Sequence, residues 1–198
     1  MKKIVNILIA VFITMNFFGC DDWTEMENKT FEPAPLPDEY YAALREYKKS
    51  DHALAFGWFG SWSNQGSSSL YYSLKGIPDS VDIVSIWGPY GSLTDYQKED
   101  LKYVQEVLGT RVVFTVFSHN MANLPGKFEN IAENIPAAAQ AIADTIHKYG
   151  YDGILIDYTG RSLVSMKPGA LAEYNVRQQN FFNKVVDCLL YTSPSPRD

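Results

Sequence analysis

The sequence lacks the features that mark several common classes of protein. Two cysteines and three histidines occur among its 198 residues, and they form no cluster with metal-ligand spacing, so we expect neither a metal site nor a cofactor. The net charge is −6 and no basic patch interrupts it, which argues against nucleic acid as a partner. No internal repeat is present. What remains is the composition of a globular domain, with 46% hydrophobic residues.

The first twenty residues are organised like a secretory signal that ends in a cysteine. A positively charged tripeptide opens the chain, residues 4–18 are apolar, and Gly19 precedes Cys20. The apolar run is short for a transmembrane anchor, which is the alternative. The segment resembles a bacterial lipoprotein signal, which implies removal of residues 1–19 and lipidation of Cys20. The acidic pair that follows resembles the export signal of Bacteroides-type surface lipoproteins, which implies the outer face of the outer membrane.

Residues 20–50 are rich in proline and charge. Such a composition cannot bury a core, so we expect a tether. Residues 40–49 are compatible with a short helix that leads into the domain, and equally with a solvated linker. Regular hydrophobic patterns begin next, and we expect one domain over residues 51–187.

Four apolar runs alternate with helical patterns along this domain. The runs predict strands over residues 53–58, 81–87, 111–117 and 153–157. Between the second and third runs, Thr94 and Gln97 have capping-box spacing at the start of a helix that Gly109 ends. Before the fourth run, apolar residues at helical spacing predict a buried helix face: Ile135, Ala139, Ile142, Ile146 and Tyr149. This alternation predicts an α/β fold with a parallel sheet. An open doubly wound sheet is the alternative, and the absence of a glycine-rich phosphate loop after the first run favours a barrel.

The fourth predicted strand ends in an acidic residue. Side chains alternate along a strand, so Leu155, Asp157 and Thr159 share one face and Asp152 points to the other. A carboxylate at the carboxyl end of a strand stands where an α/β barrel places catalytic or ligand-binding groups. We therefore expect Asp157 at a site, and a structural hydrogen-bonding role for Asp152.

Residues 151–160 read Tyr-Asp-Gly-Ile-Leu-Ile-Asp-Tyr-Thr-Gly, which resembles the Asp-Gly-x-Asp-x-Asp-x-Glu signature of glycoside hydrolase family 18, the chitinases and endo-β-N-acetylglucosaminidases. Asp152 stands at the first aspartate and Asp157 at the last. Leu155 replaces the middle aspartate, and Thr159 replaces the catalytic glutamate. Segments 56–62 and 81–88 resemble the first two strands of the family's Bacteroides branch. The resemblance implies the amino-terminal half, about four βα units, of a TIM (β/α)₈ barrel.

The same resemblance implies a function. In that family the glutamate is the general acid, the 2-acetamido group of the substrate is the nucleophile, and the last aspartate orients it. A threonine hydroxyl cannot replace the acid near neutral pH. We therefore expect a surface lipoprotein that binds N-acetylglucosamine-containing glycans without cleaving them and passes them to an outer-membrane glycan importer. The alternative is an active endo-β-N-acetylglucosaminidase that uses the substrate-assisted retaining mechanism.

Aromatic residues make up 14% of the chain, and flat rings are platforms for sugar faces. Trp58 and Trp87 stand at predicted strand ends, where they either fill the barrel interior or contact the ligand. Trp62 and Tyr90, in predicted loops, and Tyr158, beside the acidic strand end, are further candidates for contact with the glycan.

The carboxyl-terminal residues have a different character. A complete barrel of this type needs about 250 residues, and the predicted strands supply its first half. Residues 188–198 read, codon for codon, as a translated sequencing adaptor, so we expect the barrel sequence to break off at residue 187. A natural proline-rich tail is the alternative. With Cys20 lipidated and Cys188 in the adaptor, we expect no disulfide.

Overall fold

The computed structural model describes residues 36–66, 69–157 and 167–192, with side chains as far as residue 189. The compact unit within this range begins at Pro37. Three residues of the predicted site or anchor lie outside the described residues: Cys20, Tyr158 and Thr159. The predictions for them, for the signal and for residues 188–198 stay predictions.

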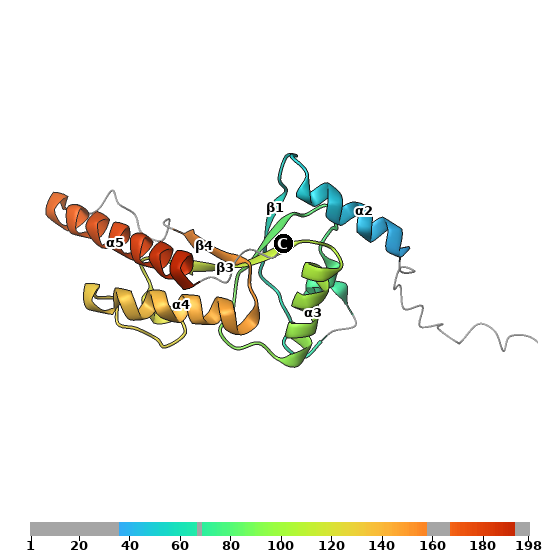
Figure 1. Cartoon of the computed structure of the whole chain (residues 1–198). Helices are drawn as coiled ribbons and strands as arrows, with labels where there is room; N and C mark the ends of the chain where they lie inside the picture. Colours follow the sequence, from blue (N-terminus) through green and yellow to red (C-terminus); the bar gives the residue numbers. More distant parts are fainter. Residues whose placement is uncertain (1–35, 67–68, 158–166, 193–198) are drawn as a thin grey trace, which may run out of the picture. The chain divides into compact units, whose positions relative to one another are not determined.

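Four parallel strands form one sheet in the order β1-β2-β3-β4 (Figure 1). Their bounds are β1 Phe56–Phe59, β2 Ile83–Ile86, β3 Arg111–Phe117 and β4 Gly153–Asp157. β3 and β4 have the predicted bounds, whereas β1 and β2 are shorter than predicted. The ladder between β1 and β2 begins late because the backbone N–H of Ala55 donates to the carboxylate of Asp82 at 2.7 Å instead of to a strand. The parallel sheet confirms the predicted α/β class.

The described α-helices are α2 Asp38–Lys49, α3 Asp95–Glu106, α4 Ile135–Tyr149 and α5 Pro168–Thr192. The predicted capping box is present at the start of α3, where the Gln97 backbone N–H donates to the Thr94 hydroxyl at 3.3 Å and the Thr94 N–H donates to the Gln97 side chain at 3.1 Å. α4 ends at Gly150, whose left-handed φ of 74° suits glycine. In the described ranges, no helix has the length and apolar character needed to cross a membrane.

α2 packs at the amino ends of the strands. The Arg45 guanidinium donates to the carbonyl of Val107 at 2.9 Å, and Lys48 Nζ donates to the carbonyl of Val81 at 2.7 Å. Residues 40–49, for which the sequence leaves helix and linker open, therefore belong to a helix that is joined to the domain.

The two faces of the sheet differ. One face is covered by helices, and its residues on β2 and β3 are at most 2% exposed: Val84, Ile86, Val112, Phe114 and Val116. α4 adds apolar residues that the helical spacing predicted, among them Ala139 and Ile142, and α3 adds Leu101 and Val104 to the same core. The second face carries the alternate residues Trp58, Ser85, Thr115, Leu155 and Asp157. In a TIM barrel this second face lines the interior.

Candidate functional site

The carboxyl ends of the strands bring an acidic residue next to an aromatic one. Asp157, the last residue of β4, pairs in register with Phe117, the last residue of β3. The Ser118 N–H donates to the carbonyl of Asp157 at 3.3 Å, which extends the pairing past the strands. Leu155 lies two residues earlier, beside Thr115, on the face that it was predicted to share with Asp157. This end of the sheet is where an α/β barrel carries its site.

A cavity of about 330 Å³ opens at the carboxyl ends of β2 and β3. It is lined by aromatic rings, amide side chains and loop backbone: Trp87, Gly88, Pro89, Tyr90, Thr115, Phe117, Asn120, Asn123 and Leu124. The rings of Trp87 and Phe117 meet edge to face, with centroids 5.2 Å apart and planes at 85°. Trp87 is 46% exposed, so part of its ring remains accessible to a ligand. Apolar rings beside a few amides suit a ligand that has both apolar faces and hydroxyl groups.

Tyr90 lines this cavity but belongs to the core. Predicted as a loop residue for ligand contact, it is 8% exposed and stacks on Phe114, with centroids 4.2 Å apart and planes at 16°. Its carbonyl accepts a hydrogen bond from the hydroxyl of Tyr151 at 3.2 Å. Burial raises the pKa of Tyr90 to about 12. The loop after β2 thus turns this ring back against the covered face of the sheet.

Trp62, also predicted to contact the ligand, makes a hydrogen bond within the protein. Its indole N–H donates to the carboxylate of Asp100 on α3 at 2.8 Å, and it is not among the described residues that line the cavity. Asp100 is fully buried and also accepts bonds from the Ser73 hydroxyl at 2.7 Å and from the Leu74 and Lys75 N–H groups at 2.7 and 3.0 Å. One buried carboxylate therefore holds the connection between β1 and β2 onto α3.

Trp58 lies away from the cavity that Trp87 lines. It is 62% exposed and meets Phe56 edge to face, with centroids 5.2 Å apart. It borders a second cavity, of about 360 Å³, beside β1, together with Tyr71 and Ile77. Of the two tryptophans predicted at strand ends, Trp87 is thus the one that lies close to the end of β4.

Three further polar residues have defined positions. One was predicted to have a structural role, and two line the cavity without having been predicted. Asp152 has the expected structural role, since its carboxylate accepts bonds from the Val112 N–H at 2.8 Å and the Gln105 side chain at 2.7 Å. Asn120 and Asn123 line the cavity and were not predicted. Asn120, three positions after the end of β3, could have been found from the sequence, because polar residues just after a buried strand stand at the site end of a barrel.

No group of three or more histidine, cysteine or acidic side chains within the described ranges is arranged to hold a metal ion. The groups at the site are three aromatic rings, two amides, a threonine hydroxyl and the nearby carboxylate of Asp157. Such groups bind by stacking and hydrogen bonding.

Parallel strands in βα order, with a cavity at their carboxyl ends, define this chain as part of an α/β barrel. Residues 19–125 match glycoside hydrolase family 18, BT1044-like. Because the match takes in more than half of the chain, the chain belongs to glycoside hydrolase family 18. The matched residues end before β4.

Individual relatives agree with this assignment. Over 120 residues the chain is 31% identical to endo-beta-N-acetylglucosaminidase F2 of Elizabethkingia meningoseptica. This match covers 58% of this chain and 35% of the relative. A solved structure of a selenomethionine BT1044 glutamate-to-glutamine variant is 34% identical with a TM-score of 0.57, and the superposition covers 76% of this chain and 52% of that one.

Two further solved structures share the fold. An endo-beta-N-acetylglucosaminidase from Cordyceps militaris is 25% identical with a TM-score of 0.53, over 80% of this chain and 50% of that one. A double variant of that enzyme, solved in complex with fucosyl-N-acetylglucosamine-Asn, has a TM-score of 0.52 at 25% identity, over 78% of this chain and 49% of that one. The chain thus spans about half of the solved structures that it matches, as a partial barrel does.

Proposed function

We propose that the chain binds N-acetylglucosamine-containing glycans at the carboxyl ends of β2, β3 and β4, on a family 18 barrel that does not cleave them. The observation that carries the proposal is the pairing of Asp157 with Phe117 beside the cavity that Trp87 lines. This arrangement offers a hydrogen-bonding carboxylate for an acetamido group next to aromatic faces for sugar rings. The relatives named as endo-beta-N-acetylglucosaminidases, one of them in complex with a fucosylated N-acetylglucosamine, support this class of ligand.

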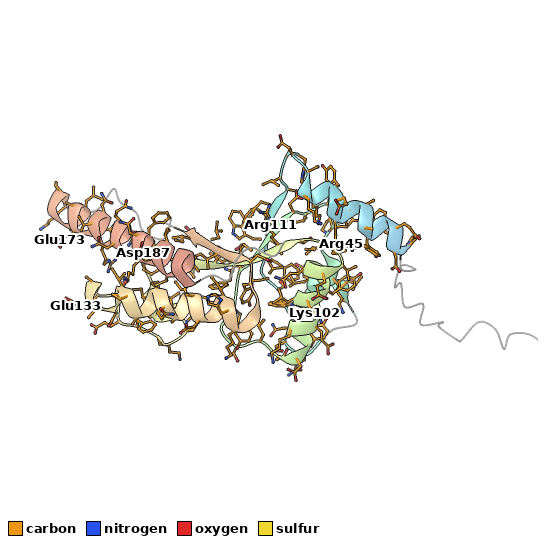
Figure 2. The ribbon with its side chains drawn as sticks, viewed as in Figure 1. Arg45, Lys102, Arg111, Glu133, Glu173 and Asp187 are labelled. Atoms are coloured by element: carbon orange, nitrogen blue, oxygen red, sulfur yellow. The ribbon has the colours of Figure 1, made fainter. Side chains whose placement is uncertain are left out.

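The case against cleavage rests on the residues that stand in the family motif. Leu155 and Thr159 occupy the positions of its middle aspartate and its catalytic glutamate. A positioned general acid contributes on the order of 10²–10⁴ in rate, and neither side chain can donate a proton usefully near neutral pH. The next acidic residue along the chain is Glu173, which lies on α5 (Figure 2).

A second candidate function is supported by a specific observation. The curated relative at 31% identity is an endo-beta-N-acetylglucosaminidase, and the match covers only 35% of its length. A whole protein of that length has further strand ends from which an acid could be supplied. An active endo-β-N-acetylglucosaminidase is therefore the alternative to a binding protein.

The proposed setting follows from the amino-terminal residues. The signal-like segment ending at Cys20, with its acidic neighbours, supports a lipid anchor on the outer face of the outer membrane. A glycan-binding lipoprotein there would hold its ligand for an outer-membrane importer. Radiolabelled palmitate incorporated by the wild-type chain and not by Cys20→Ser tests the anchor, and equal labelling of both chains would rule out Cys20 as its site.

Calorimetric titration tests the proposed ligand class. We expect the chain to bind N,N′-diacetylchitobiose and a core N-glycopeptide but not cellobiose, which has the same linkage without acetamido groups. Equal affinity for chitobiose and cellobiose would contradict a site built around an acetamido-binding carboxylate. Absence of binding to every saccharide would reject the proposal altogether.

A further inference from the structure

A cavity lies at the opposite end of the sheet from the candidate glycan site. It measures about 610 Å³, is open to solvent and is bordered by α2, the end of α3 and the segments that lead into β3 and β4. Figure 2 labels two of its cationic residues, Arg45 on α2 and Arg111 at the start of β3. It shares no lining residue with the cavity at the carboxyl ends, so a ligand here would be separate from the glycan.

The charges that line this cavity are mostly positive. Arg45, Lys48, Lys49 and Arg111 face one carboxylate, that of Asp152. The chain as a whole carries a net charge of −6, so a cavity lined by four cations has a local charge opposite in sign to that of the chain. The carboxylate is also engaged, because it accepts two hydrogen bonds from neighbouring protein groups. The field in the cavity therefore favours an anion.

Two of the cations are held in place by the fold. Lys48 Nζ donates to the carbonyl of Val81 at 2.7 Å and to the Thr110 hydroxyl at 2.8 Å. Arg45 donates from one guanidinium nitrogen to the carbonyl of Val107 at 2.9 Å and keeps further N–H groups. These contacts fix the positions of two charges before any ligand arrives.

The other two cations are less constrained by contacts within the protein. Lys49 pairs with Glu46 at 3.0 Å, but both side chains are more than 70% exposed, and such surface pairs contribute little. For the Arg111 guanidinium, no hydrogen bond or ion pair is seen with any described residue. Its planar set of donors is suited to bidentate contact with phosphate or sulfate oxygens.

We infer that this cavity binds a phosphate or sulfate monoester that is attached to a larger group. The volume lies in the range of cavities that enclose whole small molecules, so the oxyanion would occupy one part and its carrier the rest. These ligands share one binding group, the doubly or singly charged oxygens of the ester. Its carrier is either a soluble saccharide ester or the headgroup of a lipid, and the experiment separates these two sources.

The test compares two variants that remove equal charge. Arg111→Gln with Lys49→Gln removes the two adjustable cations, whereas Lys98→Gln with Lys102→Gln removes two exposed lysines of α3. Glucose 6-phosphate and glucose are titrated into each chain by calorimetry. We expect the ester but not glucose to bind the wild type, and we expect the first variant to weaken that binding about tenfold while the second leaves it within about twofold.

Vesicles distinguish the sources. Phosphatidylcholine vesicles with and without phosphatidic acid are sedimented with each chain. Selective loss of phosphatidic acid binding in the Arg111/Lys49 variant assigns the carrier to a lipid, and selective loss of glucose 6-phosphate binding alone assigns it to a soluble ester.

Equal weakening by both double variants, or no binding of either ester by the wild type up to about 10 mM, overturns the inference. Lys49→Gln alone, at a highly exposed side chain, should weaken binding about threefold and cannot be explained by unfolding.

Discussion

Phe117 and Asp157 are direct neighbours across β3 and β4, each at the last position of its strand. Forty residues separate them in the sequence, and the parallel register alone brings them together. The ring of Phe117 also meets that of Trp87 at the end of β2. Three consecutive strands thus present a carboxylate and two aromatic rings at one end of the sheet, and the proposed binding of glycans depends on this arrangement.

Trp87→Ala should weaken glycan affinity by about tenfold, because the side chain is a wall of the cavity and offers an aromatic face to the ligand. Its melting temperature should change little, since the ring is already 46% exposed. Calorimetry and circular dichroism on the same preparations measure both quantities. Trp58→Ala, at a tryptophan outside this cavity, is the matched control and should bind normally. Equal losses in both variants would mean that the cavity at β2 and β3 is not the binding site.

Restoring the family motif should create catalysis. Leu155→Asp combined with Thr159→Glu supplies the two carboxyl groups that are missing from the family motif, and Leu155 shares a strand face with Asp157. We expect the double variant to release glycan from an N-glycopeptide at a rate at least about a hundredfold above the wild-type chain. If no release appears while folding and glycan binding are retained, Thr159 does not occupy the position of the catalytic acid.

Removing the carboxylate of Asp100 should destabilise the domain strongly. Asp100→Ala leaves four donors without their acceptor, among them the indole N–H of Trp62. Unsatisfied buried donors cost about 1–3 kcal/mol each when they cannot reach water, so we expect a loss of at least about 3 kcal/mol in urea unfolding. Asp95→Asn, at an exposed carboxylate on the same helix, should cost less than about 0.5 kcal/mol. Similar losses for the two variants would mean that Asp100 does not organise the loop.

His52 and Asp82 form a buried pair at the amino end of β2. His52 Nε2 lies 2.9 Å from the Asp82 carboxylate, and Nδ1 lies 2.8 Å from the carbonyl of Ser50. Both neighbours accept hydrogen bonds, so both contacts require the doubly protonated imidazolium. The hydrogen bond to Asp82 chiefly raises the pKa of His52. Burial works to raise the pKa of Asp82, but hydrogen bonds from Ala55 and His52 outweigh it and the pKa is lowered.

Stability should therefore depend on pH in a definite direction. Because the folded pKa of His52 lies above its ordinary 6.5, its contribution is complete below about pH 6.5 and is lost as the pH rises through the folded value. The contribution of Asp82 is complete above its ordinary 3.8 and is lost as the pH falls further. Melting temperatures should thus peak between about pH 4 and pH 6.5. His52→Gln should reduce the fall in melting temperature above about pH 6.5. His147→Gln, on the exposed side of α4, should leave that fall unchanged. If the fall in melting temperature is the same in His52→Gln as in the wild type, another titrating group causes it.

Much of the fold could be predicted because its signals are local. The bounds of β3 and β4, the capping box of α3 and the glycine that ends α4 follow from residue types within a few positions. The alternation of side chains along a strand was enough to separate the structural Asp152 from Asp157. The family, too, could be identified from short motifs in the sequence, and the comparisons confirm it.

The roles of individual aromatic residues could not be predicted in the same way. Tyr90 is buried because Phe114, on a strand further along the chain, offers it a stacking surface. Trp62 is held by Asp100, on the helix that follows the next strand. No local pattern distinguishes such a ring from one that faces a ligand, since the deciding partner lies dozens of residues away.

Incubation of the chain with a core N-glycopeptide, followed by mass spectrometry of the peptide, separates binding from hydrolysis. If Thr159 stands where the proton donor belongs and no other acid replaces it, the glycopeptide remains intact at protein concentrations that saturate it. Conversion of the glycopeptide to a peptide that retains a single N-acetylglucosamine, at a rate typical of an enzyme, would show instead that the barrel cleaves what it binds.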